Sequence, residues 1–261
     1  MGSISAEQIR QNYPNIYLAV SPPRCCSTVF ARVFWQSPEV QYYCHEPFET
    51  TYYRGDTTEV ALRKILNPID ISHLCDKPKT RGGLVIKEMP YQVGENFPLL
   101  ASLTQYPIAF LIRDPRLSID SRMKKKTEVG ASPLFPFIES GWELLAKQIE
   151  WCRANQKPYF LVDATKFRQY PHSVFPSVFS CFNLDFDPSY LVWPSANDVN
   201  LDNLEGDHSH LYTRVLQSTC LESPTERVPD VTEFPEDRGF RDHVAHCVEI
   251  YNSLLVKHIT N

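Results

Sequence analysis

Residues 16–28 read IYLAVSPPRCCST, an apolar run followed by a short loop with two prolines, an arginine and two hydroxyl side chains near its end. The apolar run 16–20 is typical of a buried parallel strand, and the apolar residues that follow position 28 predict a helix. A short loop between a strand and a helix aims backbone N–H groups at one point, at the positive end of the helix dipole, where phosphate binds. This loop contains no glycine and does not match the Walker A pattern. It therefore predicts a phosphate site without the usual nucleoside-triphosphate apparatus, with an ordinary capped helix as the alternative.

A second strand and loop repeat this arrangement. Residues 108–116 read IAFLIRDPR, an apolar strand that ends in a charged turn. Pro115 suits the first position of a helix, and Ser121 comes about two helical turns after Arg113. An arginine and a serine placed in this way can hold a second phosphate. Two phosphate sites on parallel strands suit a nucleotide that carries phosphate at both ends of its ribose.

The remaining pattern alternates strands with helices. Short apolar runs predict parallel strands near 16–21, 40–44, 83–88, 107–112 and 158–162. Helical spacing of apolar residues predicts helices near 28–37, 57–67, 94–104, 115–126, 137–154, 171–182 and 240–258. The alternation predicts an α/β, three-layer sandwich, in which helices cover both faces of a parallel sheet. Ligands of such sheets bind beyond the carboxyl ends of the strands.

The two loop motifs together resemble the sulfotransferases, over roughly residues 15–195. That resemblance implies a P-loop NTPase-like sulfotransferase fold, and 3′-phosphoadenosine 5′-phosphosulfate as cosubstrate without a metal. Further stretches resemble a small soluble branch of the family: His45-Glu46-Pro47-Phe48, Ile86-Lys87-Glu88-Met89 and Val162-Asp163-Ala164. By resemblance, the first loop holds the 5′-phosphosulfate, the second motif holds the 3′-phosphate, and a later Ser-Thr pair contacts adenine. The implied cosubstrate-binding residues are Arg24, Cys25, Cys26, Ser27, Thr28, Arg113, Ser121, Ser218 and Thr219.

The catalytic residues are predicted at the ends of neighbouring strands. By resemblance, Arg24 lies beside the leaving oxygen and Lys87 neutralises the sulfuryl oxygens. The histidine that the well-studied cytosolic branch carries soon after this lysine is missing, because the sequence continues Glu88-Met89-Pro90. We therefore expect Glu46 to be the base, if burial or a neighbour raises its pKa, and His45 to orient it. Alternatively, Glu46 pairs with Arg24 or Lys87 and only shapes the site, in which case Glu88 is the next candidate.

Composition limits the partners and the compartment. The chain has 261 residues, 43% of them hydrophobic, which suits one domain over residues 1–261. A net charge of −5 gives no reason to expect a nucleic-acid or membrane partner. Eight cysteines include no C-x-x-C pair, and the histidines form no metal-ligand pattern, so no metal site is expected. The N-terminus lacks a signal-peptide pattern, and we expect a cytoplasmic protein.

Three further features bear on the acceptor side. Residues 194–236 are rich in Pro, Asp, Asn and Ser and interrupt the periodicity, which indicates a disordered insert or a lid over the acceptor site. The lysine run 124–126 is interpreted as a solvated helix face. Tyrosines bracket Glu46 and are candidates for lining an acceptor pocket: Tyr42, Tyr43, Tyr52 and Tyr53.

The function predicted from these features is sulfuryl transfer. The expected reaction moves a sulfuryl group from 3′-phosphoadenosine 5′-phosphosulfate to a hydroxyl or amine of a small-molecule acceptor, and releases adenosine 3′,5′-bisphosphate. Two alternatives stay open at this point. One is a P-loop kinase-like phosphotransferase, and the other is a catalytically inactive protein that binds the nucleotide.

Overall fold

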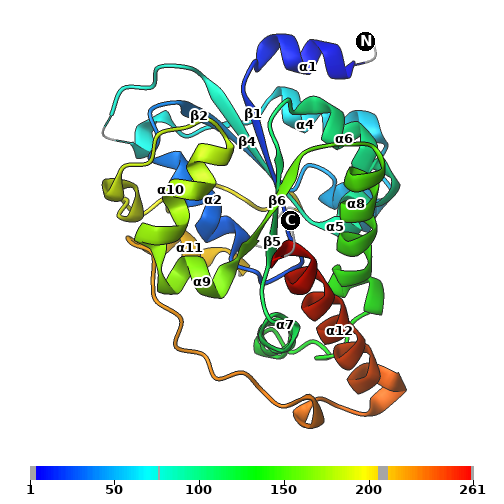
Figure 1. Cartoon of the computed structure of the whole chain (residues 1–261). Coiled ribbons are helices and arrows are strands. Elements are labelled where there is room, and N and C mark those ends of the chain that lie inside the picture. The colour runs from blue at the N-terminus through cyan, green and yellow to red at the C-terminus, as the bar shows by residue number, and fades with distance from the viewer. Residues whose placement is uncertain (1–3, 76, 205–210, 260–261) are drawn as a thin grey trace.

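A six-stranded sheet forms the centre of the protein, as the computed structural model shows (Figure 1). The structure describes residues 4–75, 77–204 and 211–259. The strand order is β3-β2-β4-β1-β5-β6, and only the short edge strand β3 pairs antiparallel. The strands are β1 (Ile16–Val20), β2 (Val40–His45), β3 (Ile69–Asp70), β4 (Gly83–Glu88), β5 (Ile108–Ile112) and β6 (Tyr159–Asp163).

The five predicted strands are confirmed within one or two residues. All residues of β1, β4 and β5 are buried, which is why β1 and β5 read as unbroken apolar runs and β4 stays apolar until its last two residues, Lys87 and Glu88. The strand β3 was missed because two residues are too few to show any periodicity.

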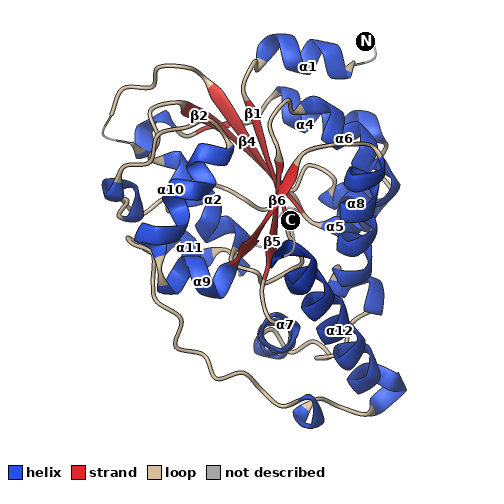
Figure 2. Ribbon diagram, in the orientation of Figure 1, coloured by secondary structure: helices blue, strands red, loops and turns tan. Residues whose placement is uncertain are grey.

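Helices flank the sheet on both sides, which confirms the three-layer α/β prediction (Figure 2). None of the described helices has the length and apolar character that crossing a bilayer requires. The α-helices are α1 (Ala6–Asn12), α2 (Ser27–Trp35), α3 (Glu49–Arg54), α4 (Thr58–Leu66), α5 (Pro90–Val93), α6 (Phe97–Leu103), α7 (Pro115–Glu128), α8 (Trp142–Ala154), α9 (Ala164–Gln169), α10 (Pro171–Cys181), α11 (Thr213–Gln217) and α12 (Phe240–Ile259).

Side chains of each strand point alternately into two apolar clusters. From β1, Leu18 joins the cluster under α1, α4, α6, α8 and α12, whereas Tyr17 and Ala19 join the cluster under α2, α9 and α10. The same alternation places Phe110 of β5 on the first side and Leu111 on the second. Figure 1 shows the two groups of helices on opposite sides of the sheet.

Two predicted helices begin as 3-10 turns. Gly94 at φ 46° ends α5, and the predicted helix 94–104 starts there as a 3-10 turn before α6. The predicted helix 137–154 likewise consists of a 3-10 turn and α8, with Gly141 at φ 78° between them. Side chains other than glycine adopt such a φ at a cost.

A buried arginine of α2 binds the described part of the segment 194–218. Arg32 of α2 has no exposed surface, and it donates hydrogen bonds to the backbone oxygens of Pro194, Val215 and Leu216. Its guanidinium also lies 5.4 Å from the ring centre of Trp35 and 5.3 Å from that of Trp193. The described part of residues 194–218, which show no clear periodicity in the sequence, is therefore bound to α2 through Arg32.

The position of Gly141 gives a first prediction. A Cβ at Gly141 would lie 3.3 Å from Pro22 Cα and 3.3 Å from Pro23 Cδ, in the loop after β1. We expect Gly141→Ala to lower the free energy of unfolding by about 1–3 kcal/mol more than Gly130→Ala, because it adds overpacking to backbone strain. Gly130 has a similar φ of 73°, but a Cβ at this position would have no neighbour within 4 Å, so it controls for the strain. Urea unfolding of both variants measures the difference, and equal losses would refute the contact.

Candidate active site

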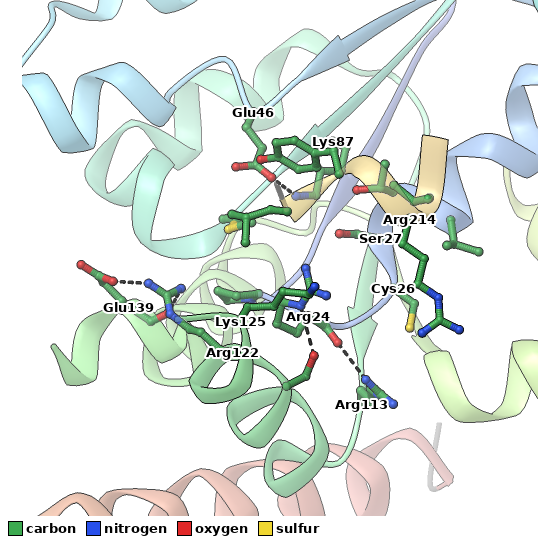
Figure 3. A pocket seen from close by; sticks show the side chains of 18 of the residues that line it. Arg24, Cys26, Ser27, Glu46, Lys87, Arg113, Arg122, Lys125, Glu139 and Arg214 are labelled. Carbon is green, nitrogen blue, oxygen red and sulfur yellow. Dashed lines mark hydrogen bonds and ion pairs between the residues drawn. The ribbon is translucent and has the colours of Figure 1, made fainter. Parts of the chain in front are cut away.

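A cavity of 510 Å³ lies where β1, β2, β4 and β5 end (Figure 3). Its lining residues come from the loop after β1, from the ends of the neighbouring strands and from α7, α9 and α11. Among the described residues, eight basic and five acidic side chains line it, although the whole chain carries a net charge of −5. The basic ones are Arg24, Lys87, Arg113, Arg122, Lys125, Lys126, Arg168 and Arg214. The cavity is therefore suited to an anionic ligand.

The loop after β1 has an unusual backbone. Arg24 and Cys26 have φ values of 62° and 58°, in the left-handed region that glycine usually occupies. Such strain persists where the surrounding structure enforces it, and it clusters at functional sites. The turn leads directly into α2, so the backbone N–H groups of its first turn and the side chains of Ser27 and Thr28 face the cavity. The loop has the geometry of an anion site although it lacks glycine.

The two predicted phosphate motifs adjoin one another. Arg24 donates a hydrogen bond from Nε to Ser121 Oγ at 3.2 Å, and the Arg24 carbonyl accepts one from Arg113 Nη1 at 3.2 Å. Arg113 is 5% exposed, and its Nε is buried without a hydrogen-bond partner among the described residues. A buried cation with an unused donor in a cavity wall fits an anionic group.

A third arginine reaches the same place from the far edge of the sheet. Arg168 lies in α9, the short helix directly after β6, and it lines the cavity near Cys26 and Arg113. The sequence pattern predicts the strand before it but points to no residue of α9. The rule that ligands bind at the carboxyl ends of parallel strands would have pointed to this helix.

A buried ion pair lies deeper in the cavity. Lys87 Nζ and Glu46 Oε1 are in direct contact, and each side chain is 1% exposed (Figure 3). His45 Nε2 lies 3.3 Å from the same oxygen, and Gln92 Nε2 donates to Glu46 Oε2 at 2.8 Å. Burial alone would raise the pKa of Glu46, but the charge of Lys87, together with the contact to His45, outweighs burial and holds the pKa below its ordinary value. The expected rise in the Glu46 pKa is therefore wrong, and Glu46 pairs with Lys87, which was the alternative prediction.

His45 and Glu88 lie behind this pair. Neither is among the side chains that line the cavity. His45 Nδ1 is hydrogen-bonded to the Tyr43 hydroxyl at 2.6 Å, and burial lowers the pKa of His45. The Glu88 oxygens accept hydrogen bonds from the backbone N–H groups of Phe48 (2.9 Å) and Met89 (2.7 Å). Burial and the neighbouring Glu46 charge raise the pKa of Glu88 to about 8 in spite of those bonds.

The opposite wall of the cavity combines tyrosines with an ion pair. Tyr53 and Tyr91 share a hydroxyl–hydroxyl hydrogen bond of 3.0 Å, and Arg122 pairs with Glu139 beside them. Of the four tyrosines expected to line an acceptor pocket, Tyr53 does so. Tyr43 instead holds His45, Tyr42 packs edge-to-face against Tyr13, and Tyr52 donates to Glu139 at 3.3 Å.

The lysine run in α7 differs from its prediction. Lys124 is exposed and pairs with Asp120 at 2.6 Å, as a solvated helix face requires. Lys125 and Lys126 line the cavity instead. Lys125 lies four residues after Ser121 and Lys126 four residues after Arg122, so each shares a helix face with a residue that lines the cavity.

Most of the residues predicted for the site meet at this cavity. Those that line it are Arg24, Cys26, Ser27, Thr28, Glu46, Lys87, Arg113, Ser121 and Ser218. Cys25 is buried in the apolar cluster of one sheet face, and Thr219 is exposed, with its carbonyl accepting a hydrogen bond from Trp193 N. Within the described part of the chain, no group of three or more His, Cys, Asp or Glu side chains is arranged to hold a metal ion.

Comparisons with known proteins identify the family. A family model described as sulfotransferase domain matches residues 16–239. A search of curated proteins found no match. Among solved structures, the sulfotransferase domain of the curacin biosynthetic pathway aligns with a TM-score of 0.52 and 14% identity, over 89% of this chain and 96% of that one. The sulfotransferase domain of the Synechococcus PCC 7002 olefin synthase aligns with a TM-score of 0.54 and 14% identity, over 92% and 95%. At such low identity the two structures show a shared fold.

Proposed function

The chain belongs to the sulfotransferase family and is a transferase, and on this basis we propose its donor, its acceptor class and its catalytic residues. The proposed donor is 3′-phosphoadenosine 5′-phosphosulfate, and the proposed acceptor is a hydroxyl or amine of a small molecule. The observation that supports this most is the double contact of Arg24, whose side chain binds Ser121 while its carbonyl accepts from Arg113. Two anion sites joined in this way suit one ligand that carries an anionic group at each end.

The residues present fit such a donor. In the proposal, the loop from Arg24 to Thr28 holds the 5′-phosphosulfate with its backbone N–H groups and hydroxyls. The unpartnered Nε of Arg113, together with Ser121, holds the 3′-phosphate. Ser218 lies on the adenine side, whereas Thr219 would contribute only through its backbone, because its side chain does not line the cavity.

Lys87 and Glu46 divide the proposed chemistry. The acceptor oxygen or nitrogen forms a bond to sulfur, the bond from sulfur to the bridging oxygen breaks, and that oxygen leaves with adenosine 3′,5′-bisphosphate. Arg24 and Lys87 neutralise the charge on the bridging and sulfuryl oxygens. Glu46 takes the acceptor proton, while His45 and Gln92 keep its carboxylate in place.

The Lys87–Glu46 pair explains how a carboxylate with a low pKa can act as a base. As long as Lys87 contacts Glu46, its charge lowers the basicity of the carboxylate. A sulfuryl group beside Lys87 would share that charge, and the pKa of Glu46 would then rise. In the proposal, Glu46 therefore becomes a stronger base when the donor is in place. Until then, Lys87 balances its charge.

The acceptor side and the domain organisation are also proposals. We place the acceptor between the Lys87–Glu46 pair and the wall of Tyr53 and Tyr91, because that part of the cavity lies next to the proposed base. We interpret residues 1–261 as one domain and residues 194–236 as a lid over the site, with positions 205–210 outside the described residues. Ser218 and α11 line the cavity, and Arg32 fastens this segment to α2.

The assignment of Arg113 to the 3′-phosphate can be tested with two nucleotides. We expect Arg113→Ala to lower the affinity for adenosine 3′,5′-bisphosphate by about 10–150-fold, because a charge-assisted hydrogen bond contributes roughly 1.5–3 kcal/mol. Adenosine 5′-phosphate should bind nearly as before, and Ser121→Ala should show the same pattern more weakly. Arg116→Ala is the matched control, since Arg116 pairs with Asp114 outside the cavity. Calorimetry measures all of these affinities, and equal losses for both nucleotides would remove Arg113 from the 3′ end.

A further inference from the structure

A carboxylate of the chain itself occupies the place between two cavity arginines. Glu226 Oε1 lies 3.1 Å from Arg113 Nη2 and 3.0 Å from Arg168 Nη1. Glu226 Oε2 accepts a second hydrogen bond from Arg168 Nη1 at 3.2 Å and one from the backbone N–H of Thr225 at 3.0 Å. The carboxylate is thus bound on both oxygens, and Arg113 is the residue that we assign to the 3′-phosphate.

The two arginines are buried next to the sheet, whereas the carboxylate lies on a more exposed stretch without regular structure. The side chains of Arg113 and Arg168 are 6% and 10% exposed, directly after β5 and within α9. Glu226 is 42% exposed, and the chain from Ser218 to Asp230 forms no helix or strand apart from one bridge at Cys220. Figure 1 shows this stretch as a long orange trace that runs outside the helices towards α12.

Arg168 also binds the stretch that carries Glu226. It donates to the backbone oxygen of Glu222 at 3.1 Å and to that of Ser223 at 3.2 Å. Burial would raise the pKa of Glu226, but hydrogen bonds, including those from Arg168, outweigh burial and lower the pKa to about 2. Glu226 is therefore an anion at neutral pH, held by the same kind of arginine fork that binds phosphate.

We propose that Glu226 holds the place of the donor's 3′-phosphate, that Arg168 is a further ligand of that phosphate beside Arg113, and that nucleotide binding displaces the Glu226 carboxylate. This rests on the proposed donor. One position between two arginines cannot hold a carboxylate and a phosphate together, because the two anions would repel each other at contact distance. Glu226 is thus an internal competitor, which balances the buried arginines when no nucleotide is bound and favours release of the bisphosphate product.

The competition gives a specific pattern of affinities. We expect Glu226→Gln to raise the affinity for adenosine 3′,5′-bisphosphate by about three- to tenfold, the range that a partly exposed ion pair allows. Adenosine 5′-phosphate does not reach the arginine pair, so its affinity should change less than about twofold. Arg168→Ala should lower the affinity for the bisphosphate by at least about tenfold, because it removes a charged ligand of the phosphate.

Glu222→Gln is the matched control. Glu222 lies in the same stretch and pairs with Arg214 at 2.7 Å, so the change removes the same charge but leaves the pair of Arg113 and Arg168 occupied. We expect it to alter neither affinity beyond about twofold. If it tightened the bisphosphate as much as Glu226→Gln does, general electrostatics would account for the effect and the proposal would be wrong.

Titration calorimetry in EDTA, with both nucleotides and all four proteins, separates the outcomes. The proposal is overturned if Glu226→Gln weakens the bisphosphate, leaves its affinity unchanged, or tightens both nucleotides equally. If the unaltered protein binds the bisphosphate but Glu226→Gln gives one of these three results, the donor assignment stands. Only the proposed role of Glu226 and Arg168 is then refuted. If neither the unaltered protein nor Glu226→Gln binds the bisphosphate, the donor assignment and this proposal are both refuted.

Discussion

Replacing Glu46 with Gln should lower turnover by about 10²–10⁴-fold and leave the affinity for adenosine 3′,5′-bisphosphate nearly unchanged. The amide keeps the shape of the carboxylate and can still accept a hydrogen bond from Gln92, but it cannot take a proton from the acceptor. Because the donor is held by the loop after β1 and by Arg113, its binding does not depend on the base. Turnover is measured with saturating donor, alongside calorimetry with the bisphosphate.

The same change also removes the partner of a buried cation. Breaking a buried ion pair by removing one member typically costs about 3–5 kcal/mol, so Glu46→Gln should also melt at a lower temperature. Unchanged affinity for the bisphosphate then shows that the variant is folded at the assay temperature. His45→Asn is the control for packing around Glu46, because it alters a neighbour of the same oxygen while the base remains.

Three results would change the assignment of the base. If Glu46→Gln turned over normally and His45→Asn were inactive, His45 would be the base. If both variants stayed active, the proton acceptor would lie elsewhere or the acceptor would need none. If Glu46→Gln lost nucleotide affinity and stability but little turnover, Glu46 would only be the counter-ion of Lys87.

The central strands could be predicted because a parallel strand that is buried on both faces is apolar throughout. The same reasoning could not predict β3, whose two residues owe their conformation to pairing with β2. It also missed α1, α3 and α9, three helices of six or seven residues that are too short for a clear period. Short elements of this kind depend on tertiary contacts more than on local pattern.

The two anion motifs could be predicted for a different reason. Arg24 lies in the short loop after β1 and Arg113 directly follows β5, and the carboxyl ends of parallel strands share one edge of the sheet. Arg168 and the two lysines of α7 lie within helices, where the sequence does not say which face meets the cavity. Glu226 was beyond sequence reasoning, because its contact with Arg113 joins distant parts of the chain through a stretch without periodicity.

The charge state of the proposed base also depended on the structure. The sequence placed Glu46 at the end of a strand and left open whether burial or a cation would set its pKa. Both act on it, in opposite directions, and the contact with Lys87 prevails. The balance between burial and the charge of Lys87 depends on how close the ends of β2 and β4 lie in space, which the sequence does not show.

Stabilisation by adenosine 3′,5′-bisphosphate without metal is the most direct test of the proposed function. Two anion sites joined through Arg24 should bind both phosphates of this nucleotide with side chains and backbone alone. At about 1,000 times the dissociation constant, binding to the folded state adds ~4.1 kcal/mol, which corresponds to a rise in melting temperature of roughly 8–16 °C.

The measurement is a melting curve in EDTA with the bisphosphate, compared with one in ATP and Mg²⁺. We expect a large shift with the bisphosphate in EDTA and a smaller one with ATP and Mg²⁺, because ATP lacks the 3′-phosphate that Arg113 and Ser121 are proposed to hold. A shift with ATP and Mg²⁺ alone would refute the proposed donor and favour a kinase-like phosphotransferase.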